Sequence, residues 1–261
     1  MKPSLNIALA LLSITAFGAT RLAAQDAAGT IKPAATPAAK PAAAAITLKI
    51  GDAAPELKVG EWYKAGPVKI EADKNYIIEC WATWCGPCVA VFPHLSELAK
   101  ANKDKLTVIG VNVWERKTPA EVKDFVAAQG DKMSYNVVAD ADGAVAQNWL
   151  KAAGRNGIPC AFIVSKGKIA WIGHPGSLQQ ELLTSILDGT CDIAALAKAD
   201  AQKEAAGKYF QEHVMPSMAK KDYAEAVVQL EAMKKEFPGE GQRIDTFIDS
   251  MKKKLAETPK P

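Results

Sequence analysis

Apolar positions between residues 46 and 190 follow strand-like and helical spacing in turn. Residues 76–81 and 106–113 are short, nearly continuous apolar runs with several β-branched side chains, which predicts two buried strands. Between them, residues 87–101 carry apolar side chains at helical spacing, with Pro93 as the expected position of a kink. The pattern therefore predicts a strand, a helix and a second strand in succession.

The following segment predicts a capped helix and a hairpin. Thr118 and Pro119 are the residue types preferred at a helix N-cap and at the first helical position, and Gly130 is expected to end that helix. Residues 161–164 and 169–172 are apolar runs separated by a short polar turn, which is typical of a β-hairpin.

A further helix is expected near the end of this region. Ser177 and Gln180 resemble a capping box, and Gly189 is expected to end the helix after Leu187. Residues 135–138 are strand-like. Strands that alternate with helices and finish in a hairpin indicate an α/β sandwich around a mixed sheet.

The N-terminal segment differs in composition from the rest of the chain. The apolar run 7–18 is short for a membrane span but suits the core of a signal peptide, so we expect a signal peptide at 1–24. An uncleaved N-terminal anchor is the alternative, and only in that case do we expect a membrane contact. Residues 25–46 are rich in Ala and Pro and are expected to form a linker. The chain is therefore expected to be exported, to the periplasm or the cell envelope.

The C-terminal part, residues 191–261, has only helical patterns. Residues 221–226 and Leu230, before the expected helix end at Phe237-Pro238, resemble the second helix of a tetratricopeptide-type hairpin. One such unit does not build the solenoid that gives those repeats a binding groove. We therefore expect an all-α extension packed on a main domain at 47–190, and a partner-binding module is the alternative.

Net charge argues against some partners. The chain has 32 Lys and Arg against 29 Asp and Glu, a formal charge of +3. Removal of residues 1–24 would take away Lys2 and Arg21 and no acidic residue. A nearly neutral chain gives no electrostatic case for binding nucleic acid or an anionic membrane surface.

The five cysteines are too few for a disulfide scaffold, and two of them carry the strongest chemical signal. In the run WATWCGPC, Cys85 and Cys88 lie three residues apart where a strand passes into a helix. Unpaired N–H groups at a helix N-terminus stabilise a thiolate, so Cys85 is the expected nucleophile and Cys88 the resolving thiol. A zinc site or an inert disulfide is the alternative. Zinc needs a second ligand pair, and the three histidines are scattered singly, so we predict no metal.

These motifs together resemble the thioredoxin superfamily. The resemblance rests on WATWCGPC, on Gly157-Ile158-Pro159 before the hairpin and on Gly173 at its end, and it covers about residues 50–190. The long segment 114–156 between them is similar to the insert of exported, TlpA-like disulfide reductases. The resemblance implies a thioredoxin-like three-layer sandwich around a mixed sheet, here with a C-terminal all-α extension.

The resemblance also implies roles for single residues. Pro159 matches a cis-proline that faces the cysteine pair and leaves backbone groups free to bind a substrate peptide. Glu79 matches a buried acid that takes the proton of Cys88, and a solvated edge-strand glutamate is the alternative. Thioredoxins place a lysine beside that acid, where this chain has Gly110. The docking surface around the sulfurs is implied to include Trp84, Gly86, Pro87, Ile158, Gly173 and His174. For His174, which precedes Pro175, the alternative is a turn residue with no role in docking.

The Gly-Pro dipeptide between the cysteines goes with a reducing role in this family. The resemblance therefore implies reduction of protein disulfides through a mixed disulfide, with no cofactor beyond the Cys85–Cys88 dithiol, and re-reduction by a membrane thiol transporter. A binding module that holds a partner through residues 191–261 is a rival from another class. A thiol peroxidase is a weaker rival, because that chemistry needs a positioned arginine and this chain has few.

Two further cysteines have a shared expected position. If Glu79 and Pro159 face the CGPC helix, Cys80 and Cys160 point to the opposite face of the sheet. The family places their strands side by side and antiparallel, so the two thiols form a possible second pair. The alternative is that each is a small buried hydrophobe. Cys191 is expected to be a free, half-buried thiol.

Overall fold

The computed structural model describes residues 47–257. The expected signal peptide at 1–24 and the expected linker at 25–46 lie outside these residues. No helix in the described part is long and apolar enough to cross a membrane.

One six-stranded sheet forms the centre of the main domain. Its strands are β1 (Val59–Lys64), β2 (Asn75–Trp81), β3 (Leu106–Asn112), β4 (Asn136–Asp140), β5 (Cys160–Ser165) and β6 (Lys168–Gly173). The α-helices are α1 (Gly86–Ala101), α2 (Pro119–Gln129), α3 (Gln180–Leu187), α4 (Ile193–Tyr209), α5 (Met215–Ala219), α6 (Tyr223–Glu236) and α7 (Gly241–Glu257). Short 3-10 or π-helical segments are η1 (Gly130–Met133), η2 (Ala146–Lys151), η3 (Pro175–Ser177), η4 (Phe210–Val214) and η5 (Pro238–Glu240).

The strand order is β1-β4-β3-β2-β5-β6, and the sheet is mixed. Strands β2, β3 and β4 run parallel, whereas β1, β5 and β6 join antiparallel. Strand β2, which leads into the CGPC run, is therefore interior and lies between β3 and β5. The predicted thioredoxin-like fold class is confirmed.

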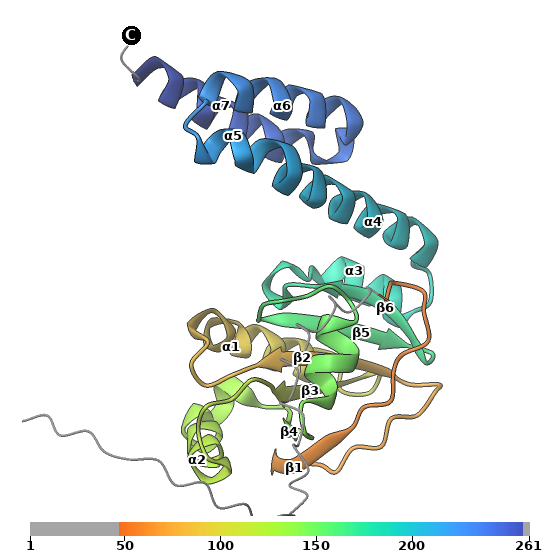
Figure 1. Ribbon diagram of the computed structural model, residues 1–261. Helices are drawn as coiled ribbons and strands as arrows, with labels where there is room; N and C mark the ends of the chain where they lie inside the picture. The colour runs from red at the N-terminus through yellow and green to blue at the C-terminus, as the bar shows by residue number, and fades with distance from the viewer. Residues whose placement is uncertain (1–46, 258–261) are drawn as a thin grey trace, which may run out of the picture. The chain divides into compact units, whose positions relative to one another are not determined.

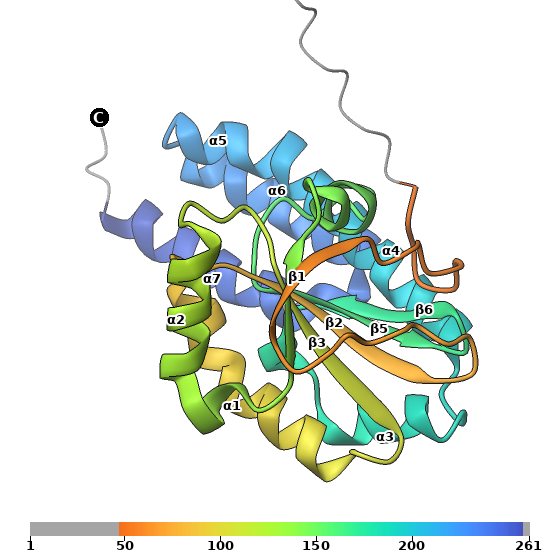
Figure 2. The same cartoon turned by 90° about the horizontal axis from the view of Figure 1, so that it is seen from below.

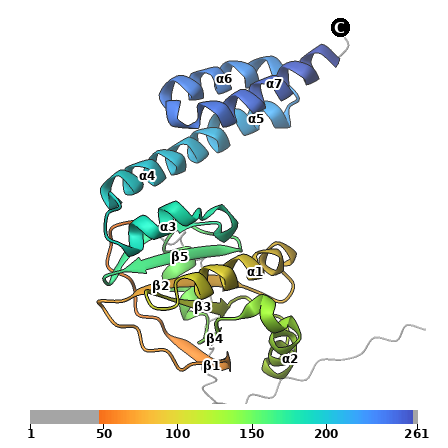
Figure 3. The ribbon, with the colours of Figure 1, turned by 180° about the vertical axis from the view of Figure 1, so that it is seen from behind.

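Helices and loops cover both faces of the sheet, which gives the three predicted layers. Helices α1, α2 and α3 cover one face, and their buried side chains include Phe92, Val122 and Leu183 (Figures 2 and 3). The opposite face packs against Leu48 and the η2 residue Trp149, among others. Because both faces are covered, the side chains of β2 are buried from Tyr76 to Trp81.

The pattern of apolar residues did not predict β1. This strand lies at the sheet edge, pairs with β4 alone and does so with an irregular register. None of its side chains is fully buried. An edge strand of this kind has no continuous apolar run by which it is recognised.

The predicted capping box of α3 is wrong. The helix begins at Gln180, its N-cap is Gln179, and that residue caps it with no side-chain hydrogen bond. The Ser177 hydroxyl instead donates to the His174 carbonyl, 2.8 Å away, within η3. Pro175 begins this 3-10 turn, so the serine is used one turn earlier than the capping pattern requires.

The segment after Cys191 is helical, as the pattern predicts. Ile193 and Leu196 at the start of α4 pack against the sheet core. The later helices share a separate apolar cluster that includes Leu230 of α6 and Ile248 of α7, and these two helices pack side by side (Figure 1). The helix expected around residues 221–237 is α6, with Asp222 as its N-cap.

Candidate redox site

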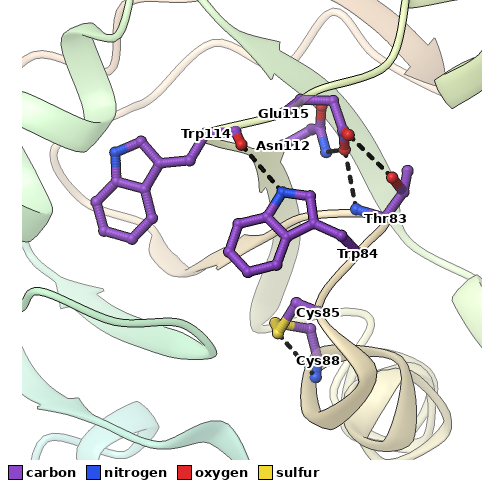
Figure 4. Close-up of a disulfide and its surroundings, with 7 residues drawn as sticks. All are labelled: Thr83, Trp84, Cys85, Cys88, Asn112, Trp114 and Glu115. Atoms are coloured by element: carbon purple, nitrogen blue, oxygen red, sulfur yellow. Dashed lines mark hydrogen bonds between the residues drawn. A yellow bond between two sulfur atoms is a disulfide. The ribbon is translucent and has the colours of Figure 1, made fainter.

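Cys85 and Cys88 lie at the first turn of α1, directly after β2. Cys85 is the N-cap of the helix, and the Cys88 backbone N–H donates to its sulfur, with 3.2 Å between N and Sγ. Pro87 occupies the first turn of the helix, where a missing N–H costs no hydrogen bond. The two cysteines form a disulfide with their Cα atoms 5.2 Å apart (Figure 4). The local sequence thus places one sulfur at the positive end of the helix dipole.

The two sulfurs differ in their access to solvent. Cys85 is 4% exposed and Cys88 is completely buried. Trp84, Gly86 and Pro87 around Cys85 are exposed. Of the two sulfurs, that of Cys85 is therefore the one open to solvent, and a thiolate at this position would be stabilised by the helix N-terminus.

A loop that follows β3 holds Trp84 in place beside the cysteine pair. Its indole N–H donates to the Trp114 carbonyl at 3.0 Å, and the Arg116 guanidinium lies 4.8 Å from the centre of its ring. In Figure 4 the Trp84 ring lies between the Trp114 carbonyl, to which its indole N–H donates, and the two cysteines. Trp114 adopts a φ of +50°, a conformation that L-residues seldom take. Neither Trp114 nor Arg116 was among the residues predicted for the site.

The same loop carries Glu115, which ties it to the residue before Trp84. Its carboxylate accepts hydrogen bonds from both the N–H and the hydroxyl of Thr83, each at 2.9 Å, and from the Asn112 amide at 2.9 Å. The Arg116 and Lys117 N–H groups also donate to it. Partial burial by itself would raise the pKa of Glu115, but these hydrogen bonds outweigh it and lower the pKa to about 2.

Glu115 was also absent from the residues expected at the site. It lies just after the carboxyl end of β3, beside the carboxyl end of the parallel strand β2. Residues after neighbouring parallel strands meet at one edge of a sheet, and this rule is the sequence signal that would have found it.

We expect Glu115→Gln to destabilise the protein in a pH-dependent way. A lowered carboxyl pKa stabilises the fold above the unfolded-state value near 4.5, and this stabilisation disappears as the pH falls towards 2. Because the side chain is largely solvated, we expect a loss of about 1–2 kcal/mol in the free energy of unfolding at pH 7. Urea unfolding from pH 7 down to pH 2 measures this difference.

Glu97→Gln is the matched control, because Glu97 is an exposed glutamate on α1. Its unfolding free energy should follow that of the unaltered protein across the pH range. A Glu115→Gln deficit that stays constant down to pH 2 would contradict the assignment to carboxylate hydrogen bonds.

The cis-proline loop and the end of the hairpin lie at one pocket. The Ile158–Pro159 peptide bond is cis. Pro159, Gly173 and His174 line a pocket of about 270 Å³ together with the α4 residues Asp200 and Lys203. His174 is exposed, and its Nδ1 accepts from the Gly176 N–H at 3.1 Å, which is the geometry of a turn residue. Ile158 is half-buried and packs against the cores on both faces of the sheet.

Glu79 lies in the middle of the sheet. It is completely buried in β2, where its sheet neighbours are Gly110 of β3 and Ala161 of β5. Neither carboxyl oxygen has a hydrogen-bond partner in the described structure, and burial raises the pKa of the carboxyl well above its usual range. The alternative of a solvated edge-strand glutamate does not fit this burial.

Cys80 and Cys160 are opposite each other in the β2–β5 ladder. Both belong to the core cluster on the face away from Cys85 and Cys88, as the strand pleat predicts. Each is a buried free thiol, and burial raises the pKa of both. Cys191 is a half-buried free thiol. Among residues 47–257, no group of three or more His, Cys, Asp or Glu side chains is arranged to hold a metal ion.

The chain is similar to several known proteins. Residues 50–172 match the model of the AhpC/TSA family. Protein FixW of Rhizobium leguminosarum is 31% identical over 159 residues, which are 56% of this chain and 69% of FixW. Thiol:disulfide interchange protein HelX of Rhodobacter capsulatus is 28% identical over 123 residues, which are 46% of this chain and 64% of HelX. The solution structure of a thiol:disulfide interchange protein from Bacteroides sp. aligns with a TM-score of 0.44 and 23% identity, over 54% of this chain and 90% of that one.

The matched part of the chain contains the whole sheet except the last residue of β6, together with the CGPC disulfide and the cis-proline loop. With this fold and with the extent of the match to FixW, the chain belongs to the AhpC/TSA family.

Proposed function

We propose that this thioredoxin-like oxidoreductase is exported and reduces disulfide bonds of protein substrates through Cys85 and Cys88. The observation that carries the proposal is the position of Cys85. It caps α1, is bonded to Cys88 and lies among the exposed residues Trp84, Gly86 and Pro87. The name of HelX describes thiol:disulfide interchange in that relative, which is the same class of reaction.

The proposed reaction is two successive thiol–disulfide exchanges. The Cys85 thiolate attacks one sulfur of the substrate disulfide, so that a mixed disulfide forms and the other substrate sulfur leaves and takes up a proton. The Cys88 thiol then loses its proton and attacks the Cys85 sulfur. The Cys85–Cys88 disulfide forms, the mixed disulfide breaks, and the second substrate sulfur is released as a thiol. Two electrons have passed to the substrate, and the reaction needs no cofactor beyond the dithiol.

The remaining parts of the proposal rest on the sequence. The Gly86-Pro87 dipeptide supports a reducing role, and the apolar run 7–18 supports export. After each cycle the disulfide must be reduced again, and we propose a membrane thiol transporter as the electron donor. The proposed docking residues are Trp84, Gly86, Pro87, Ile158, Pro159, Gly173 and His174.

The direction of the reaction is tested by its reduction potential. We expect the Cys85–Cys88 pair to equilibrate with a dithiothreitol couple at a potential near that of thioredoxin, about −270 mV. The fraction of oxidised protein is measured by thiol alkylation and mass spectrometry. Insulin should be reduced when dithiothreitol is supplied.

A potential of about −180 mV or higher would shift the role to an isomerase or oxidant and would overturn the proposed direction. Peroxide turnover as fast as insulin reduction would favour the thiol peroxidase instead.

A further inference from the structure

Four buried polar atoms without hydrogen-bond partners gather around Gly110. They are the two carboxyl oxygens of Glu79, the indole nitrogen of Trp81 and the hydroxyl oxygen of Tyr135. Glu79 and Trp81 are completely buried, and Tyr135 is 6% exposed. Buried polar groups in folded proteins are nearly always hydrogen-bonded, so four unpaired atoms in one place call for a functional explanation.

The three side chains fill the space next to Gly110, which has no side chain of its own. A Cβ atom on this glycine would lie 3.0 Å from Tyr135 Cε2, 3.2 Å from Trp81 Nε1 and 3.3 Å from Glu79 Oε2. The three side chains therefore converge on one point of β3. Any larger residue at position 110 would push them apart.

The chemistry of the three groups is complementary. An ionised carboxylate only accepts hydrogen bonds, an indole N–H only donates, and a tyrosine hydroxyl does both. A tyrosine hydroxyl donates to an ionised carboxylate and accepts from a protonated one, so Tyr135 is suited to Glu79 in either state. In the described residues Glu79 is hydrogen-bonded to no lysine, arginine or other group, and the two polar groups that converge with it at Gly110 are neutral.

We propose that the Tyr135 hydroxyl and the Trp81 indole N–H, which converge with Glu79 at Gly110, are positioning groups that donate hydrogen bonds to its carboxylate once it is ionised and so prepare it to accept the proton of Cys88. The inference rests on the proposed function, because it assigns the proton released in the resolving step. In that step Glu79 gains the proton, Cys88 attacks the Cys85 sulfur, and the substrate sulfur leaves. In this proposal the two donors act through Glu79 and take no part in the sulfur chemistry themselves.

The placement of Glu79 on the face of the CGPC helix supports this assignment. Glu79 shares its strand face with Trp81, and Trp81 packs in one core cluster with Cys85, Cys88 and Tyr135. Its neighbours Gly110 and Ala161 on the adjoining strands do not titrate. The titratable groups near it are Tyr135 on this face, and Cys80 and Cys160 on the other, while Cys85 and Cys88, joined in their disulfide, belong to the core cluster on the Tyr135 face. Burial, and then the charge of Glu79, raise the pKa of Tyr135, which keeps its hydroxyl protonated and able to donate.

The test is Tyr135→Phe in the full chain with Cys85 and Cys88 reduced by dithiothreitol. Removal of a donor makes the carboxylate less stable, so the titration midpoint of Glu79 should rise by about one pH unit. Carbon-13 NMR of the labelled glutamate carboxyl carbons measures this midpoint, and the signal of Glu79 is the one absent from Glu79→Gln. Insulin reduction below the midpoint should then be about tenfold slower, and the two rates should converge at high pH.

Tyr76→Phe is the matched control. Tyr76 is also a buried tyrosine, but its hydroxyl accepts from the Glu71 N–H and donates to the Lys69 carbonyl, and its ring lies on the opposite face of the sheet. This variant should leave the Glu79 midpoint unchanged. An unchanged midpoint in Tyr135→Phe, or an equal shift in Tyr76→Phe, would overturn the inference. Failure of the unaltered protein to reduce insulin would instead refute the proposed function, while the NMR titration would still decide the hydrogen bonds.

Discussion

Replacement of Cys85 by Ser should abolish insulin reduction, with a loss on the order of a thousandfold or more. Cys85 is the sulfur at the N-terminus of α1, the more exposed of the pair, and bonded to Cys88. A serine hydroxyl at this position is not ionised at neutral pH and does not attack a disulfide. Turnover is followed by the precipitation of reduced insulin chains with dithiothreitol as the reductant.

Replacement of Cys88 by Ser should have a different result. The first attack by Cys85 needs only Cys85, so the variant should form a mixed disulfide with the substrate and fail to resolve it. Mass spectrometry under non-reducing conditions should show a one-to-one adduct that dithiothreitol removes. Cys191→Ser is the control, because Cys191 is a free thiol at the start of the C-terminal helical segment and should be dispensable. Full turnover by Cys85→Ser, or an adduct on Cys85→Ser equal to that on Cys88→Ser, would show that another residue is the nucleophile.

The two tryptophans of the WATWCGPC run should differ sharply in their effect on stability. Trp81 is completely buried and packs edge-on against Phe92, with ring centres 5.3 Å apart, and in a stacked arrangement against Phe125 at 5.8 Å. Trp81→Ala removes these contacts and leaves a cavity between β2, α1 and α2. We expect the free energy of unfolding to fall by about 3–5 kcal/mol, measured by urea denaturation.

Trp84→Ala is the same substitution three residues later. Trp84 is 45% exposed and is held by one hydrogen bond to the Trp114 carbonyl and by the Arg116 guanidinium. Its loss should cost about 1 kcal/mol or less in unfolding free energy. Because Trp84 borders the Cys85 sulfur, the variant should instead raise the KM for insulin several-fold. Equal destabilisation by the two substitutions would contradict the assignment of Trp81 to the core and Trp84 to the docking surface.

Most elements of the main domain follow from local patterns. Strands β2 and β3 are continuous apolar runs because both of their faces are covered. Helix α2 begins at the Thr118–Pro119 pair, where the Thr118 side chain and the Glu121 carboxylate form a capping box. Strand β1 has no such run, since it is an edge strand with half-buried side chains, and it was missed for that reason.

In the candidate site, too, some residues could be predicted from local patterns and others could not. Cys85 and Cys88 were predicted because the two thiols lie close together in sequence, where a strand passes into a helix. Glu115 and Tyr135 were not predicted, because the residues they meet are distant in sequence. Glu115 accepts a hydrogen bond from Thr83 across 32 positions of the chain, and Tyr135 and Glu79 both approach Gly110 on β3.

Local residue patterns were enough to predict the alternation of strands and helices, the cysteine pair after a buried strand, and the face to which the strand residues around it point. These properties depend on backbone periods and helix-terminal hydrogen bonds, which neighbouring residues decide. The polar contacts in this region of the sheet depend on the tertiary structure. The parallel pairing of β2 with β3 brings Glu79 beside Gly110, and the loop after β3 brings Trp114 and Glu115 to the Trp84 loop. Contacts of this kind depend on strand register and packing between distant segments, which no local pattern encodes.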